Sequence, residues 1–142
     1  IGLLFITYFT GTIGSAISGK VALKMPVPLG MALGVFILML GTLLTLSSSL
    51  GFIVAGFFIN AFGFFLTHSL ASSWVNQCAS RAKASANALY LVFYYVGASS
   101  GGLYLQPFWQ WQGWSGIVVG ALLMYSVTLF LCVWLWRRST VQ

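Results

Sequence analysis

The stretch LGFIVAGFFINAFGFFLTHSLASSWVNQCASRAK, residues 50–83, decides the class of fold. Residues 50–74 are mostly apolar and carry no Asp, Glu, Lys or Arg, and the first charges after them are Arg81 and Lys83. A helix needs roughly 20 mainly apolar residues to cross a bilayer. The stretch therefore predicts a transmembrane helix that is followed by a polar, basic connection.

The composition extends this interpretation to the whole chain of 142 residues, which is 60% hydrophobic and 4% charged. About a quarter of the residues of a soluble domain are charged. We therefore predict an all-α integral membrane protein, surrounded by the lipid bilayer. The net charge of +6 arises because the chain contains six basic residues and no Asp or Glu. This is not the dense basic patch that binds nucleic acid, so we expect no nucleic-acid partner.

Apolar stretches of similar length divide the rest of the chain. We predict one transmembrane domain, residues 1–142, with five spans at residues 1–18, 29–46, 50–74, 87–105 and 115–136. The basic residues lie after the first, third and fifth spans, as the pairs Lys20 and Lys24, Arg81 and Lys83, and Arg137 and Arg138. The positive-inside rule places these ends, and the C-terminus, in the cytoplasm. Tryptophans mark both expected interfaces: Trp109, Trp111 and Trp114 outside, Trp74, Trp134 and Trp136 inside.

The five spans differ in their polar content. Residues 29–46 and 115–136 are apolar around the whole helix, and we expect them to face lipid. The other three spans carry Asn, His, Tyr, Ser and Gly on particular faces. Polar groups are costly in hydrocarbon, so these three spans are expected to face protein or a water-filled cavity. In the first span, Gly11, Gly14, Ser15 and Ser18 suit close helix packing.

Two segments resemble the major facilitator superfamily of secondary transporters, in particular its twelve-span bacterial branch of efflux permeases. They are GFFLTHSLASSW at residues 63–74 and ALYLVFYYVG at residues 88–97, which look like spans ten and eleven. The resemblance implies the C-terminal portion of such a transporter, spans eight to twelve, in a bacterial inner membrane. It also implies an N-terminal half that precedes Ile1, alternating access, and proton-coupled efflux of a drug-like or sugar-like small solute.

A cytoplasmic loop motif of the superfamily has a partial copy after the first span. The motif reads Gly, three residues, an acid, a base, one residue, Gly and Arg. Gly19 and Lys24 match it, whereas Leu23 stands at the acidic position and Pro26 at the second glycine. Because Leu23 replaces the acid, this loop lacks the negative charge with which the basic residue of the motif would pair.

The candidate site residues lie on two helix faces. Asn60, Phe64 and His68 recur every four residues and share one face. Tyr90, Tyr94, Gly97 and Gly101 likewise share a face of the fourth span. Asn60, Phe64, His68, Tyr90 and Tyr94 could line a substrate cavity, whereas the spacing of Gly97 and Gly101 favours helix packing.

His68 has two interpretations that the sequence leaves open. An ionisable group inside a membrane is a candidate for function, and histidine changes charge near neutral pH. Alternatively, a neutral His68 hydrogen-bonds a neighbouring helix, because the chain contains no acid to serve as a proton partner.

Enzymatic chemistry is not expected. One histidine and two cysteines make no standard zinc site, and no carboxylate is present for general acid–base catalysis. No glycine-rich phosphate loop occurs, so no cofactor is predicted. The alternative to a transporter is a small polytopic membrane subunit with a structural or partner-binding role. Seven further spans encoded upstream in frame would exclude that alternative.

The basic connections make the predicted topology testable. With Cys78 and Cys132 replaced by serine, single cysteines at Ser48 and Gln110 should react with an impermeant thiol reagent from outside. A cysteine at Ser80 should react only after the membrane is opened. Labelling at Ser80 in intact cells would contradict the topology.

Overall fold

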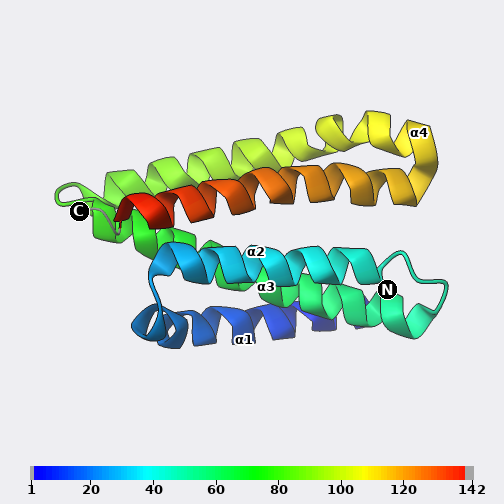
Figure 1. Ribbon diagram of the computed structural model, residues 1–142, viewed down its shortest axis with the longest axis horizontal. Helices are drawn as coiled ribbons and strands as arrows, with labels where there is room; N and C mark the ends of the chain where they lie inside the picture. Colours follow the sequence, from blue (N-terminus) through cyan, green and yellow to red (C-terminus); the bar gives the residue numbers. More distant parts are fainter. Residues whose placement is uncertain (1, 140–142) are drawn as a thin grey trace.

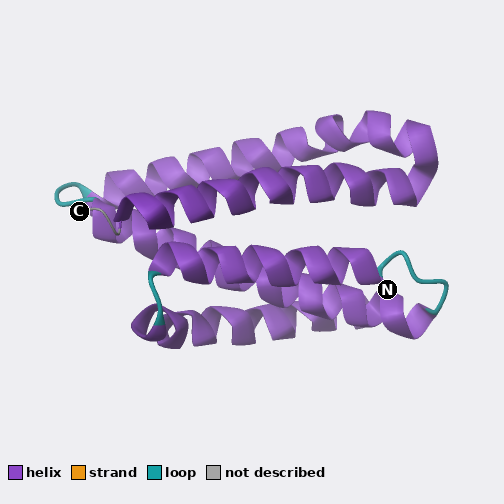
Figure 2. Ribbon diagram, in the orientation of Figure 1, coloured by secondary structure: helices purple, strands orange, loops and turns teal. Residues whose placement is uncertain are grey.

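The structure is a computed structural model that describes residues 2–139, with side chains from residue 6 onward. It contains four helices, α1 (Gly2–Lys24), α2 (Val27–Leu44), α3 (Leu50–Cys78) and α4 (Lys83–Ser139), and no strand within the described residues (Figure 2). By length and composition, α2, α3 and α4 are apolar enough to cross a membrane. The all-α membrane fold is thereby confirmed, whereas the number of five spans remains a prediction.

The helix α4 is two helical arms that fold back on each other. Gln112 (φ −143°, ψ 25°) and Gly113 (φ 56°, ψ −130°) interrupt the helical conformation, and the two arms run antiparallel from that point (Figure 1). Glycine suits this reversal because it has no Cβ to oppose a positive φ. The connection expected between the spans at residues 87–105 and 115–136 is therefore much shorter than predicted. The first arm continues through Pro107, which removes only one backbone donor.

The helix α3 holds the fold together, since it contacts α1, α2 and α4. Figure 1 shows α1 and α2 beside α3, with the two arms of α4 on the far side of α2. The inner core joins α2, α3 and the second arm of α4, and its buried members are Val27, Met31, Ala32, Leu66, Leu70 and Cys132.

The expectation that residues 29–46 face lipid around the whole helix is wrong, although Leu33 and Phe36 on one side are 41% and 51% exposed. Met31, Val35 and Leu38 of α2 are each at most 7% exposed, because α2 lies between α3 and α4. A uniformly apolar helix suits a protein core as well as lipid, so composition did not distinguish them. The second arm of α4 fits the expectation better, with Val127 56% and Phe130 69% exposed. The first arm, expected to face protein or a cavity, contributes no residue to the buried set of α4.

The antiparallel helices α2 and α3 approach until their backbones touch at two pairs of glycines. A Cβ atom built on Gly63 would lie 2.7 Å from the carbonyl oxygen of Gly34. One built on Gly41 would lie 2.7 Å from that of Gly56. The paired glycines are seven residues apart on each helix, which is about two turns, so both contacts fall on one seam. Small residues at such seams permit close packing in membranes.

The predicted small-residue packing of the first span is confirmed against α3. A Cβ atom on Gly14 would lie 2.7 Å from the carbonyl oxygen of Phe62. The Ser69 hydroxyl donates to the Ser15 hydroxyl at 2.9 Å. These contacts orient α3 between its two neighbours.

Replacement of Gly63 by alanine should destabilise the protein. The new methyl group would meet the backbone of α2, with Leu38 N at 2.6 Å, and the backbone cannot rotate aside as a side chain can. Overpacking of this kind costs about 1–3 kcal/mol. Gly19→Ala is the control, because a Cβ there meets nothing within 4 Å. Thermal unfolding in one detergent should show a lower midpoint for Gly63→Ala only. Equal midpoints would contradict the close packing.

Candidate functional site

Four of the five candidate cavity residues meet between α3 and the first arm of α4. The Tyr90 hydroxyl lies 2.8 Å from Nδ1 of His68, and it donates when that nitrogen carries no proton. The Phe64 ring stacks with the imidazole, with ring centroids 5.8 Å apart and an angle of 11° between the ring planes. The Tyr94 ring lies 4.8 Å from the imidazole, centroid to centroid. We call Phe64, His68, Tyr90 and Tyr94 the aromatic cluster.

Local sequence explains the cluster. Phe64 and His68 lie one helical turn apart on α3, and Tyr90 and Tyr94 lie one turn apart on α4, so each pair projects from one face. A second polar contact aligns the helices nearby, where the Ser72 hydroxyl donates to Oδ1 of Asn87 at 2.9 Å. All four cluster side chains are half-buried within the chain.

The cluster has the chemistry of a site for neutral solutes. It combines four ring faces with the hydroxyl groups of Tyr90 and Tyr94 and the imidazole of His68. Nδ1 of His68 is engaged by Tyr90, and no partner for Nε2 is found among the described residues. Rings that stack, next to a few hydrogen-bonding groups, are typical of small-molecule sites.

Asn60 lies outside the aromatic cluster and belongs to a separate hydrogen-bonded chain. Its Nδ2 donates to the Thr42 hydroxyl at 2.7 Å, and Thr42 donates to the carbonyl oxygen of Leu38 at 3.0 Å. The hydroxyl of Thr45 donates to the carbonyl oxygen of Thr42 at 2.6 Å. Nε1 of Trp114 in turn donates to both oxygens of Thr45, each at 3.2 Å. This chain links α3, α2 and the second arm of α4.

Sequence reasoning did not identify Thr42, Thr45 or Trp114 as a unit. Two threonines three residues apart in an apolar helix share a face, and this was the only available signal. Trp114 was interpreted as an interface tryptophan, and its hydrogen bond to α2 depends on the reversal at Gly113.

Hollows lie on two sides of Asn60. One, of about 200 Å³, is lined by Asn60 and Phe64 together with residues of α1 and α3. The other, of about 190 Å³, lies between α2, α3 and both arms of α4. Asn60 therefore lies next to Phe64 of the aromatic cluster, but its amide donates to Thr42 of α2.

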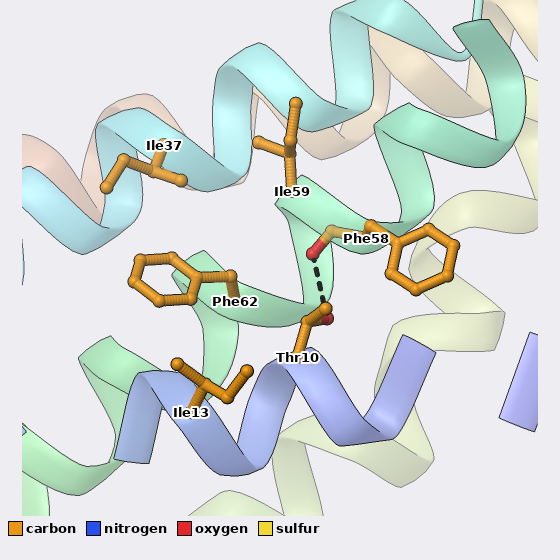
Figure 3. Close-up of a pocket in the computed structure, with 6 residues that line it drawn as sticks. All are labelled: Thr10, Ile13, Ile37, Phe58, Ile59 and Phe62. Atoms are coloured by element: carbon orange, nitrogen blue, oxygen red, sulfur yellow. Dashed lines mark hydrogen bonds between the residues drawn. The ribbon is translucent and has the colours of Figure 1, made fainter. Parts of the chain in front are cut away.

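A third hollow, of about 280 Å³, lies between α1, α2 and α3 and is apolar (Figure 3). Its one polar side chain, Thr10, donates to the carbonyl oxygen of Phe58 at 3.2 Å (Figure 3). Thr10 also donates to the carbonyl oxygen of Thr7 at 2.6 Å, so the hollow offers a polar solute little to bind. Its surface suits a hydrocarbon chain.

Three of the remaining predicted residues are glycines with open space beside them. A Cβ atom built on Gly97, Gly101 or Gly19 would meet nothing within 4 Å. The helix packing expected of Gly97 and Gly101 is thus not made by any helix described here. Gly19 and Lys24 are exposed near the end of α1, which stops before Pro26. In residues 2–139, no group of three His, Cys, Asp or Glu side chains could hold a metal ion.

The fold is that of an α-helical membrane protein, and the chain is similar to known membrane transporters. The chain is 36% identical over 134 residues to an uncharacterized MFS-type transporter, YybF, of Bacillus subtilis, covering 94% of this chain and 33% of that protein. It is 35% identical over 133 residues to an uncharacterized transporter of Buchnera aphidicola from Schizaphis graminum, covering 92% and 32%. It is 43% identical over 76 residues to the inner membrane transport protein YnfM of Escherichia coli, covering 54% and 18%.

The chain belongs to the major facilitator superfamily of membrane transporters. It spans about a third of the length of the first two of these relatives. No family model and no solved structure matches it.

The hydrogen bond within the aromatic cluster can be measured by a double-mutant cycle. Tyr90→Phe and His68→Leu should each lower the free energy of unfolding, and the double variant should lose less than their sum. The coupling should be about 0.5–1.5 kcal/mol, the net value of one such hydrogen bond. Tyr94→Phe with His68→Leu is the control, because these two side chains share only ring contact. Equal coupling in both cycles would contradict the Tyr90 bond.

Proposed function

We propose that the chain is the C-terminal portion, spans eight to twelve, of a secondary active transporter in a bacterial inner membrane. The parent protein would export small organic solutes, drug-like or sugar-like, in exchange for protons by alternating access. The observation that carries the proposal is the match of 94% of the chain to about a third of an MFS-type transporter. The name of the Escherichia coli relative supports the inner membrane as the location.

In this proposal the aromatic cluster contributes one wall of the solute site. The cluster is half-buried within the chain, and an N-terminal half would supply the opposite wall. The rings of Phe64 and Tyr94 would stack on a ring or on the apolar face of a sugar. Nε2 of His68 and the hydroxyl of Tyr94 would each hydrogen-bond a hydroxyl or carbonyl group of the solute. Tyr90 would be a positioning residue, because its hydroxyl fixes the imidazole.

Proton coupling would depend on residues outside this chain. The sequence contains no Asp or Glu, and the imidazole of His68 lies among neutral side chains. Carboxylates are the usual proton carriers of transporters together with histidine. The proposal therefore assigns binding to this portion and coupling to the N-terminal half.

Transport by the full-length protein in proteoliposomes tests the proposal. Export of at least one solute from a panel of aromatic drugs and sugars should require an imposed pH gradient. His68→Gln and Tyr94→Phe should raise the apparent KM about two- to tenfold, which corresponds to one hydrogen bond. Tyr104→Phe is the control, because it removes a bond to the carbonyl oxygen of Gly120 that lies wholly within α4.

Protein abundance must be measured for each variant, since loss of a buried polar partner also destabilises a fold. An unchanged KM in His68→Gln and Tyr94→Phe would remove the aromatic cluster from the solute site. Failure to transport any solute, with the protein folded, would favour the structural subunit instead.

A further inference from the structure

The hollow of about 190 Å³ beside Asn60 has its walls in α2, α3 and both arms of α4, and we call it the polar hollow. Half of its lining is apolar, and the other half carries a polar side-chain group. The polar lining residues are Thr42, Thr45, Asn60, Trp114 and Tyr125. A water molecule needs about 15 Å³ of such space, so the hollow has room for several.

The polar hollow extends from one end of the helices toward their middle. Thr45 and Trp114 lie at the end where α2 stops and α4 reverses (Figure 1). Asn60 lies ten residues after Leu50, the first residue of α3, which places it about 15 Å along the helix. Tyr125 lies a similar distance beyond the reversal, in the second arm of α4. The hydrocarbon core of a bilayer is about 30 Å thick, so Asn60 and Tyr125 lie near its middle.

The amide of Asn60 has more hydrogen-bonding capacity than its contacts within the chain use. An amide side chain has two N–H donors and an oxygen with two lone pairs. Nδ2 of Asn60 donates to the Thr42 hydroxyl at 2.7 Å and to the carbonyl oxygen of Leu38 at 3.4 Å, whereas Oδ1 accepts no bond from a described residue. In the described part of the chain, every fully covered side-chain oxygen or nitrogen has a partner. Oδ1 of Asn60 is therefore open to a small molecule.

The apolar hollow between α1, α2 and α3 provides a contrast within the same chain. It is larger, at about 280 Å³, but Thr10 is its one polar side chain, and that hydroxyl is directed to two backbone carbonyl oxygens. Cavities with apolar walls stay dry, whereas a cavity that offers each molecule two to four polar partners holds water. Only the second description fits the polar hollow.

We propose that the polar hollow is a binding site for water in the assembled protein, with Asn60 and Tyr125 as the main partners. Water would enter from the end of the helices at Trp114 and Thr45, which is the level of the lipid headgroups. Bridging water is nearly as favourable in enthalpy as a direct hydrogen bond. It would join α3 to the second arm of α4 in a region where polar groups without partners are costly. The proposal does not depend on what the protein transports.

X-ray radiolysis of the purified full-length protein in lipid nanodiscs tests this site. The pulse forms hydroxyl radicals where water is present, and mass spectrometry locates the side chains that they oxidise. Phe57 and Phe62 are a matched pair, since both are half-buried on α3, and Phe57 lines the polar hollow whereas Phe62 lines the apolar one. Phe57 should be oxidised about threefold faster than Phe62 or more, because apolar cavities stay dry. Tyr125 is a second reporter, and it should also be oxidised.

Substitutions connect the oxidation to the polar hollow. Asn60→Leu removes the amide and should lower the oxidation of Tyr125 at least about twofold, because one main partner of the water is lost. Thr10→Val is the matched control, because it removes the hydroxyl of the apolar hollow, and it should leave Tyr125 unchanged. Ala121→Leu keeps Asn60 and its bond to Thr42 while it fills part of the hollow, so it provides the same test if Asn60→Leu folds poorly.

Mixing with H₂¹⁸O shortly before the pulse distinguishes bound water from bulk water. Trp114 at the rim should take up the heavy oxygen first, and Tyr125 should follow with a delay. Equal oxidation rates of Phe57 and Phe62 would mean that the polar hollow is dry or is filled by another part of the protein, and would overturn the proposal. Unchanged oxidation of Tyr125 in both Asn60→Leu and Ala121→Leu, or simultaneous labelling of Tyr125 and Trp114, would show access of bulk water in place of a binding site.

Discussion

The close contact between the backbones of α2 and α3 is the constraint on which the rest of the structure depends. Gly34 meets Gly63 and Gly41 meets Gly56, and no larger residue fits at these crossings without a shift of backbone. In a bilayer, apolar side chains gain little by leaving lipid for protein, so helix association relies on dispersion and hydrogen bonds at short range. The glycines allow the two backbones to approach this closely. Asn60 of α3 then lies within hydrogen-bonding distance of Thr42 of α2.

The fixed position of α3 determines where the aromatic cluster forms. One side of α3 is occupied by the α2 seam and another by α1, through Gly14 and Ser15. His68 and Phe64 project toward the start of α4, where Tyr90 and Tyr94 meet them. The other arm of α4 is attached elsewhere, by Trp114 to the end of α2. Polar contacts thus join α4 to α3 near its start, and to the end of α2 at the reversal beside Gly113.

The sequence predicted the helices and most of the cluster because these follow from local patterns. Uncharged apolar stretches specify membrane helices, and a spacing of four residues places Phe64 and His68 on one face. Partnership between helices does not follow from such patterns. Gly97 and Gly101 have the spacing of packing residues, yet a Cβ on either would meet nothing within 4 Å. The contact between α2 and α3 is instead made by glycines seven residues apart. Asn60 shares the face of His68 by spacing, but Thr42 on α2 captures its amide.

Neutral polar groups and charged groups lie at different levels of the membrane. Within the helices, the hydrogen bonds of Asn60, Tyr90 and Trp114 are made by neutral amide, hydroxyl and indole groups, which avoids the cost of charge in hydrocarbon. At the helix ends, the six basic residues are the only side chains of the sequence with a full formal charge at neutral pH, and all six are exposed. The chain thus separates its neutral hydrogen-bonding groups, which lie along the helices, from its cations, which lie at the helix ends where charge is tolerated.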